Sequence, residues 1–409
     1  MIKKEQHNDE FHLFRIRNNN GEWIDEDNVV YLSRIEAIFY KMLAGKNGKS
    51  LSLQNGPSNS IWCYKHEYEE VIALNNPRPI FAPRKLKIKK HSINKTIMEK
   101  PLIYSGDKPF KRKARTHQSD FRENVLKVSF DPENRYGKYG AFLKPEDANK
   151  GLNFCDDFRE EIKEKINDRF HCLTAIQHDG LYANMLRSEH IPWNIFVPMM
   201  HDYDATAKVF NDIIGTNEID KVTNIRIEWA PKDKTLCLND NTSFDTYIEY
   251  ECKGKKCGIG IEVKYTEEGY PFGKKERREV MENDNSRYAQ ITKTCGWFIP
   301  EIAQCLIKDT PLCKNKYRQI WRNHILGASM VNNHLTEKIE KFHSITIYPK
   351  GNPHFCEVLP QYEQFLTNEG RSTFGYITIE DLIDLIEKHF PKTVEYQNWI
   401  LYLKDRYPF

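Results

Sequence analysis

A glutamate and a lysine separated by one residue stand in the apolar stretch GIGIEVKYTE, residues 258–267. Side chains in a strand alternate between two faces, so Glu262 and Lys264 would share one face, roughly 7 Å apart along the chain. The intervening isoleucines and valine would point into the core. Gly258 and Gly260 lie on the face of Glu262, and we expect them to leave it bare, so that a ligand can approach the backbone.

A third chemical group stands in the preceding stretch SFDTYIEYEC, 243–252, which also alternates. A hairpin through KGKK, 253–256, would pair the two strands antiparallel and place Asp245 beside Glu262. Two adjacent carboxylates repel each other unless a positive charge lies between them. A divalent cation with oxygen ligands, typically Mg²⁺, fits there, and Lys264 could then stabilise charge that develops on a phosphorus.

The same residue types also allow a plainer interpretation. Asp, Glu and Lys on one sheet face could form an exposed network of salt bridges, each contributing about 0–1 kcal/mol. A second Glu-x-Lys string, Glu161 and Lys163, lies in a stretch that predicts a helix, where positions i and i+2 do not face each other. The spacing therefore has chemical meaning only in the strand.

Periodicity predicts the elements around this pair. Three strands over 222–231, 243–252 and 257–267 form a meander, and 342–350 predicts a further strand. Helices are predicted around 156–168, over 178–200 with Pro192 kinking or dividing it, over 209–215 and 314–330, and from Thr378, where Asp381 suits a capping box.

The first part of the chain has a different character. Residues 29–44 and 60–74 have apolar positions at helical spacing, so we predict a small N-terminal helical module over 1–83. Residues 84–115 carry twelve Lys or Arg and two acidic residues. This basic connector could lie along phosphates or be a solvated linker. The third predicted domain is 116–409.

Composition sets the class of the protein. Of the 409 residues, 39% are hydrophobic and 29% charged, which is typical of a globular chain. No apolar run approaches the ~18 residues of a membrane helix, and the N-terminus has no apolar signal region, so we expect a cytoplasmic protein without a membrane partner. The ten cysteines form no C-x-x-C pair, and we expect reduced thiols rather than a zinc site.

The run FDTYIEYECKGKKCGIGIEVKYTEE resembles the D-(x)n-E-x-K hallmark of the PD-(D/E)XK nuclease superfamily. A Gln-Ser…Arg opening at Gln118, Ser119 and Arg122, the stretch MLRSEHIPWNIFVPM and the helix YRQIWRNHILGAS resemble bacterial restriction-endonuclease-like members. The resemblance covers roughly 112–390. It implies an α/β (α+β) fold, in which a mixed central sheet is flanked by helices in a restriction-endonuclease-like core.

The resemblance also implies roles for residues. Asp245 and Glu262 would be Mg²⁺ ligands, with Mn²⁺ able to substitute, and the backbone carbonyl of Val263 would be an additional ligand. Lys264 would be the catalytic lysine. Glu189 is our candidate for a glutamate from an earlier helix, and a surface helix residue is the alternative. Gln319, with Arg322 one turn on, is the candidate near the phosphate. No proline precedes Asp245, a departure that is frequent in the superfamily.

The predicted function is a Mg²⁺-dependent DNA endonuclease in bacterial restriction or phage defence, where the defence role rests on the resemblance alone. A repair or structure-selective nuclease, a ribonuclease, and a nucleic-acid-binding protein with an inactive nuclease fold are the alternatives. DNA is the expected partner. A homodimer and a partner protein of a defence system stay open.

Overall fold

The computed structural model describes residues 101–409 except 133, 172, 270 and 332–337, together with short segments within 1–71. The chain divides into two compact units, Met1–Thr96 and Ile97–Phe409. All of the sites discussed below lie in the second unit.

The middle of the larger unit is the predicted meander of β7 (Lys221–Trp229), β8 (Phe244–Cys252) and β9 (Lys255–Val263), paired antiparallel. Cys252 pairs with Lys255, so the turn consists of Lys253 and Gly254 alone. Both have positive φ angles, 50° and 74°, as the two-residue type I′ hairpin requires. The turn and the alternating apolar residues together fix the register of β8 against β9.

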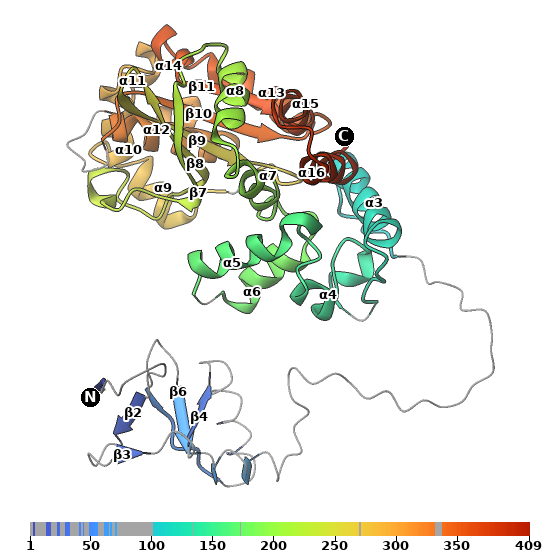
Figure 1. Cartoon of the computed structure of the whole chain (residues 1–409). Coiled ribbons are helices and arrows are strands. Elements are labelled where there is room, and N and C mark those ends of the chain that lie inside the picture. Colours follow the sequence, from blue (N-terminus) through green and yellow to red (C-terminus); the bar gives the residue numbers. More distant parts are fainter. Residues whose placement is uncertain are drawn as a thin grey trace. The chain divides into compact units, whose positions relative to one another are not determined.

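Two parallel strands complete the sheet. The predicted strand over 342–350 is observed as β10 (Phe342–Tyr348), which lies parallel to β9, and β11 (Phe374–Thr378) lies parallel to β10. The strand order is β11-β10-β9-β8-β7 (Figure 1). Parallel neighbours need crossover connections, and helices supply them between β9 and β10 and between β10 and β11. The sheet is thus mixed, as expected.

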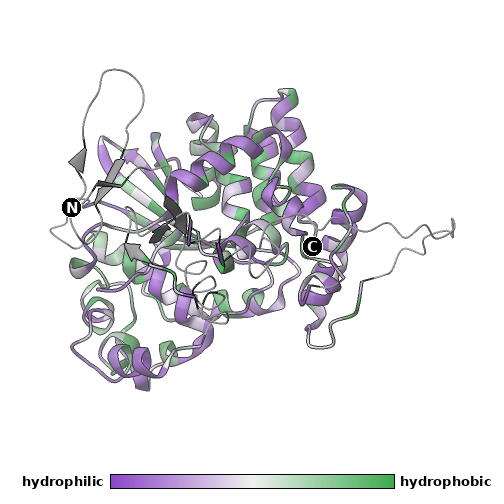
Figure 2. Cartoon of the chain, turned by 90° about the horizontal axis from the view of Figure 1, so that it is seen from below, coloured by the Kyte–Doolittle hydropathy of each residue, from purple (hydrophilic) through white to green (hydrophobic). Residues whose placement is uncertain are grey.

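Helices cover both faces of this sheet (Figure 1). On the Ile259, Ile261 and Val263 side, α7, α8 and α15 contact the strands, and α3, α5 and α16 belong to the same hydrophobic core. On the other side, α12 contacts β9 and β10, and α10 and α13 belong to that second core. The helices carry both hydrophilic and hydrophobic residues along their length (Figure 2). None of the described helices is long and apolar enough to cross a membrane. Their bounds are α3 Pro109–Asn124, α4 Pro145–Asn149, α5 Arg159–Arg169, α6 Ala175–His178, α7 Ile191–Met199, α8 Tyr203–Ile214, α9 Lys274–Val280, α10 Arg287–Thr294, α11 Pro300–Ala303, α12 Arg318–Val331, α13 Pro353–Glu363, α14 Asn368–Ser372, α15 Ile379–His389 and α16 Val394–Arg406.

The helices predicted in this unit are present. The stretch over 178–200 is divided, because a π-helical turn at Asp179–Ala183 ends before α7 and Pro192 occupies the first turn of α7. Thr378 caps α15, accepting a hydrogen bond from the backbone N–H of Asp381 at 3.1 Å. The helix predicted over 209–215 begins six residues earlier, at Tyr203, as α8.

The N-terminal unit differs from its prediction. Strands β4 (Val29–Leu32) and β6 (Ile61–Tyr64) pair antiparallel within the stretches expected to be helical, 29–44 and 60–74. Runs of β-branched and aromatic residues favour strands, and here that preference outweighs helical spacing. Among the described residues of these stretches, helical ones stand at Lys41 and Ala44 and at His66–Glu67 and Glu70–Val71. The other described strands of this unit are β1 Lys3–Lys4, β2 Phe14–Arg17, β3 Trp23–Ile24 and β5 Gln54–Asn55.

The basic connector predicted over 84–115 is described only from residue 101 onward, and 84–100 lie outside the described residues. Its last part is not a linker, since α3 begins at Pro109 and joins the core of the larger unit through Ala114.

Candidate active site

The predicted carboxylates meet in one row across the sheet. Thr246 pairs with Ile261, and continuing this antiparallel register by one place sets Asp245 opposite Glu262. The backbone N–H of Val263 donates to Oδ2 of Asp245 at 2.7 Å, which fixes this carboxylate against β9. On the other side, Glu262 pairs with Thr346 of β10.

Glu262 and Lys264 contact each other directly. The ammonium of Lys264 donates to Oε1 of Glu262, and the side-chain amide of Asn323 on α12 donates to Oε2. Both Glu262 and Lys264 are buried, with 6% and 5% of their surface exposed. Because both residues are buried, they do not form the exposed salt-bridge network considered above. The backbone N–H of Lys264 bonds to the carbonyl of Ile347 at 2.8 Å, holding this residue beside the sheet.

The row of Asp245, Glu262 and Lys264 has more carboxylates than ammonium groups. Burial, followed by the negative charge of Glu262, raises the pKa of the Asp245 carboxyl well above its usual range. Burial lowers the pKa of the Lys264 ammonium, but Glu262 and Asp245 outweigh it, and the pKa lies above its usual value. One ammonium thus faces more than one carboxylate, and a bound cation would relieve the repulsion.

Sequence reasoning missed a third acid, Glu228. The β7–β8 register runs from Ile227 opposite Thr246 to Trp229 opposite Phe244, so Glu228 falls opposite Asp245. Its φ of 54° is rare for a residue with a side chain. Burial, then the charges of Glu262 and Glu189, raises its pKa to about 7. Glu228 lies in a strand that the sequence predicts, but only the observed pairing of β7 with β8 places it beside Asp245.

Asn323 was also missed. It lies one turn of α12 beyond Gln319, the residue chosen from the sequence, and it makes the hydrogen bond to Glu262. Gln319 lines a small pocket together with Glu262 and Lys264. Its Oε1 is buried and has no hydrogen-bond partner among the described residues, which leaves an acceptor oxygen beside the acidic row. Arg322 instead pairs with Asp240 at 3.0 Å and with Glu276 at 3.6 Å.

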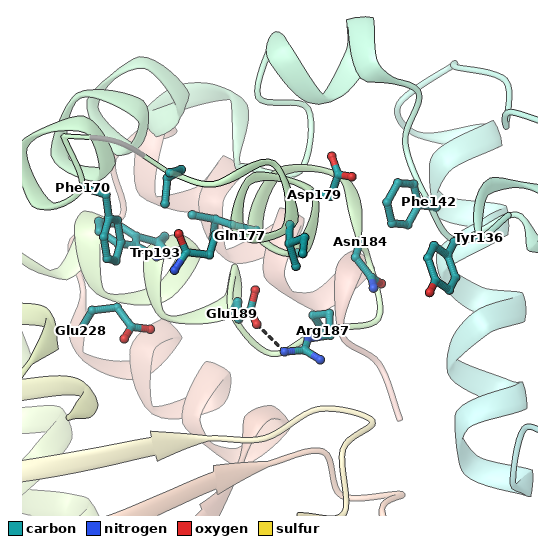
Figure 3. A pocket seen from close by; sticks show the side chains of 14 residues that line it. Tyr136, Phe142, Phe170, Gln177, Asp179, Asn184, Arg187, Glu189, Trp193 and Glu228 are labelled. Carbon is teal, nitrogen blue, oxygen red and sulfur yellow. Dashed lines mark hydrogen bonds and ion pairs between the residues drawn. The ribbon is translucent and has the colours of Figure 1, made fainter. Parts of the chain in front are cut away.

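Glu189 lies in the turn just before α7, rather than within a helix as predicted. It pairs with Arg187 and lines a larger pocket that also contains Glu228 (Figure 3). The absence of a side chain at Gly180 makes room for its carboxylate. Glu189 acts on the acidic row through Glu228, whose pKa its charge raises.

The expectation that glycines leave the face of Glu262 bare is wrong. A Cβ at Gly258 would overlap the ring of Tyr247, and one at Gly260 would overlap the rings of Phe244 and Phe342. The glycines admit aromatic rings instead of a ligand, because filling this space with buried rings stabilises the core. The face of β9 before Glu262 is therefore closed to a ligand.

The donor set suits a hard divalent cation, although no group of three or more His, Cys, Asp or Glu side chains in the described part of the chain is arranged to hold a metal ion. Carboxylate oxygens from Asp245 and Glu262 are the ligand type that Mg²⁺ and Mn²⁺ prefer. Burial and the neighbouring charge of Glu262 raise the pKa of Asp245, which indicates negative charge that the protein itself leaves uncompensated, and the unpartnered oxygen of Gln319 adds a neutral acceptor beside it. The residues present therefore fit such an ion.

Comparison with known proteins gives one match. A family model of the PD-(D/E)XK nuclease superfamily matches residues 105–409, which is most of the chain and nearly all of the larger unit. No curated protein and no solved structure matches.

Proposed function

Because the chain belongs to the PD-(D/E)XK nuclease superfamily, we propose that it is a divalent-metal-dependent DNA endonuclease whose active centre is Asp245, Glu262 and Lys264. The observation that carries the proposal is the meeting of two carboxylates and a buried ammonium at adjoining positions of β8 and β9. Such a set is costly to bury and contributes little to stability, so a catalytic role is the stronger explanation.

Each group has a role that follows from its position. Asp245 and Glu262 would hold Mg²⁺, or Mn²⁺ in its place, and the carbonyl of Val263 is the further ligand that the superfamily suggests. When bound, such an ion supplies Lewis-acid activation of the phosphodiester and of water. Lys264 places a fixed positive charge where the phosphoryl group gains negative charge. The N–H of Val263 and the amide of Asn323 orient the two carboxylates.

Gln319 is proposed to contact the phosphate by donating from its side-chain amide N–H, since it lines the same small pocket as Glu262 and Lys264. Glu189 is proposed to act in the same centre, together with Glu228, on the side of the larger pocket. We place the activity in bacterial restriction or phage defence, because the flanking stretches MLRSEHIPWNIFVPM and YRQIWRNHILGAS resemble restriction-endonuclease-like proteins.

Incubation of supercoiled plasmid with the full chain and Mg²⁺ tests the proposal. Nicked and linear products are expected, and none with EDTA. Lys264→Ala should lower the cleavage rate by about 10²–10³, the usual cost of one preorganised charge or donor. Equal cleavage by both proteins would point to a contaminant. Cleavage by neither would favour a binding protein with an inactive nuclease fold, and cleavage of RNA alone would favour a ribonuclease.

A further inference from the structure

Two pockets adjoin on one side of the acidic row. The aromatic pocket, of about 620 Å³, is lined by rings that include Tyr136, Phe142, Phe170 and Trp193 (Figure 3). The basic pocket, of about 430 Å³, is lined by Lys111, Arg115, Arg135 and Lys138. Tyr136, Phe142, Asn184 and Arg187 line both, so the two pockets form one continuous groove.

The basic pocket holds positive charge that the protein does not neutralise. Among the described residues, no carboxylate lies within ion-pair distance of Lys111, Arg135 or Lys138. Arg115 differs, since it is paired with Asp107 at 2.6 Å. The acidic residue in the lining, Glu267, accepts hydrogen bonds from the backbone N–H groups of residues 188 and 265. Cations without a carboxylate partner in such a groove suit the phosphates of a nucleic-acid strand.

These cations lie against tyrosine rings. Lys138 stands 5.2 Å from the centre of the Tyr139 ring, and Arg135 stands 5.4 Å from that of Tyr136. Alternating positive charge and aromatic rings are the features that bind single strands, because charge tracks the backbone while rings stack on bases.

The aromatic pocket presents apolar surface that a duplex could not use. Tyr136 is 56% exposed and Ile176 is 85% exposed at this pocket, and Figure 3 shows Phe170 and Glu228 on one side with Tyr136 and Phe142 on the other. In a duplex the base faces are stacked on each other, and only an unstacked base offers them to a ring.

Hydrogen-bond donors in the same pocket suit a base edge. The side-chain oxygens of Gln177 and Asn184 each accept a backbone N–H, at 3.1 Å in both cases. Their amide nitrogens have no hydrogen-bond partner within the described part of the chain. These nitrogens could donate to the ring nitrogens and carbonyl oxygens of a base.

Both pockets reach the candidate active site. Glu228 lines the aromatic pocket and falls opposite Asp245 in the register of β7 against β8. Thr266 and Glu267, which line the basic pocket, follow Lys264 by two and three residues. The groove and the acidic row therefore share neighbouring residues, and we expect a strand bound at one to extend to the other.

We propose that the groove binds an unpaired strand of the DNA substrate, with one unstacked base in the aromatic pocket and its neighbouring phosphates in the basic pocket. The inference rests on the proposed function and narrows its substrate to DNA with a single-stranded segment at the cut. The role of Lys111 would also give part of the basic segment 84–115 a function.

Fluorescence anisotropy of a labelled oligodeoxynucleotide of about 15 nucleotides, single-stranded or as the duplex of the same sequence, tests this with the full-length Lys264→Ala protein and Ca²⁺. The single strand should bind more tightly. Tyr136→Ala should weaken its binding by about fivefold or more, and Tyr136→Phe should restore it, because the ring and not the hydroxyl stacks. Leu401→Ala, at a residue 58% exposed that lines neither pocket, is the matched control and should change nothing.

Salt dependence tests the basic pocket separately. The double variant Lys111→Ala/Lys138→Ala should reduce the slope of log affinity against log salt by roughly 1.4, about 0.7 for each single-strand phosphate that is no longer neutralised. The double variant Lys208→Ala/Lys221→Ala removes the same charge at exposed residues that line neither pocket, and should leave the slope unchanged.

Equal affinity for duplex and single strand, or an unchanged affinity of Tyr136→Ala, would overturn the inference even if the wild-type chain cleaves plasmid. Absence of cleavage, with single-strand binding that Tyr136→Ala still weakens, would overturn the proposed function and leave the groove standing.

Discussion

The chain contains the string Glu-x-Lys in two settings, and the fold treats them differently. At the end of β9, Glu262 and the following Lys264 contact each other and are buried. In α5, Glu161 pairs instead with Lys165 at 3.5 Å, and Lys163 pairs with Glu160 at 3.0 Å. Backbone period decides this, because neighbours on a helix are three or four residues apart and neighbours on one strand face are two apart.

The energetic consequences differ as well. The pairs on α5 are partly exposed to solvent and contribute a few tenths of a kcal/mol at most. Burying Glu262 and Lys264 costs desolvation free energy that their attraction offsets only in part. A sequence retains such a pair for a reason other than stability. The contrast between the two strings therefore supports the proposal that Glu262 and Lys264 act in catalysis.

The largest test of this contrast exchanges each glutamate for its neutral counterpart. Glu262→Gln should reduce plasmid cleavage by about 10²–10³, since it weakens cation binding and the contact with Lys264. Glu161→Gln, the matched control on α5, should cleave at the wild-type rate. Initial rates at saturating Mg²⁺ measure both, and an equal loss in the two variants would remove the distinction.

Metal binding should also distinguish the Glu-x-Lys string at β9 from the one on α5. A ligand that binds only the folded chain stabilises it by about 2.7 kcal/mol at a hundredfold excess over its Kd. Mn²⁺ should thus raise the melting temperature of the wild type and of Glu161→Gln, and EDTA should reverse the rise. Asp245→Asn should lose most of the shift. A full shift in Asp245→Asn would show that the ion binds elsewhere.

The glycines of β9 give a third test, which measures stability. Gly260→Ala should destabilise the chain by about 1–3 kcal/mol, because the new Cβ would overlap the rings of Phe244 and Phe342. Gly375→Ala in β11 is the matched control, since its Cβ would lie 3.9 Å from Ile345 and should cost far less. Urea unfolding of both variants measures the difference, and equal stability would mean that the rings move aside easily.

The smallest expected effect is a pH dependence. Folding raises the pKa of Glu228 from its ordinary 4.5 to about 7. Its ionised form therefore destabilises the folded chain above about pH 7, and this penalty is lost as the pH falls toward the ordinary pKa. Since Glu228 is only half-buried, solvent screening limits the effect to on the order of 1 kcal/mol.

Urea unfolding in metal-free buffer should show wild-type stability rising between about pH 8 and pH 5, with a smaller rise in Glu228→Gln. Asp245 contributes in the same direction, because its pKa is also raised, so some of the rise should remain. Identical pH profiles for the two proteins would contradict the assignment of this titration to Glu228.

Most of the sheet and the row of site residues could be predicted from the sequence, because alternation and the KGKK turn fix which residues share a face and a register. Glu228 could not, since its place opposite Asp245 depends on a pairing that no motif encodes. Asn323 was missed because Gln319, one helical turn earlier, suits the same role equally well. Whether Asp245, Glu262, Val263, Lys264, Gln319 and Glu189 act as proposed stays a prediction.

Failures elsewhere have physical causes too. Short apolar runs such as Val29–Leu32 suit a strand or a helix, and pairing with β6 decides for the strand. Gly258 and Gly260 were expected to leave space for a ligand, because a sequence does not show which aromatic rings will pack against a glycine. The pockets could not be predicted for the same reason, as their walls come from residues 104–142, 170–193, 228 and 266–267, which are far apart in the chain.

The two-residue turn of Lys253 and Gly254 limits which insertions and deletions this chain can accept during evolution. With only two residues between β8 and β9, the turn cannot compensate for an insertion or deletion of a single residue within the paired part of β9. Such a change would move every later side chain of β9 to the opposite side, sending the carboxylate of Glu262 among the isoleucines. Substitutions can accumulate along this hairpin, but changes in its length should be tolerated only in steps of two.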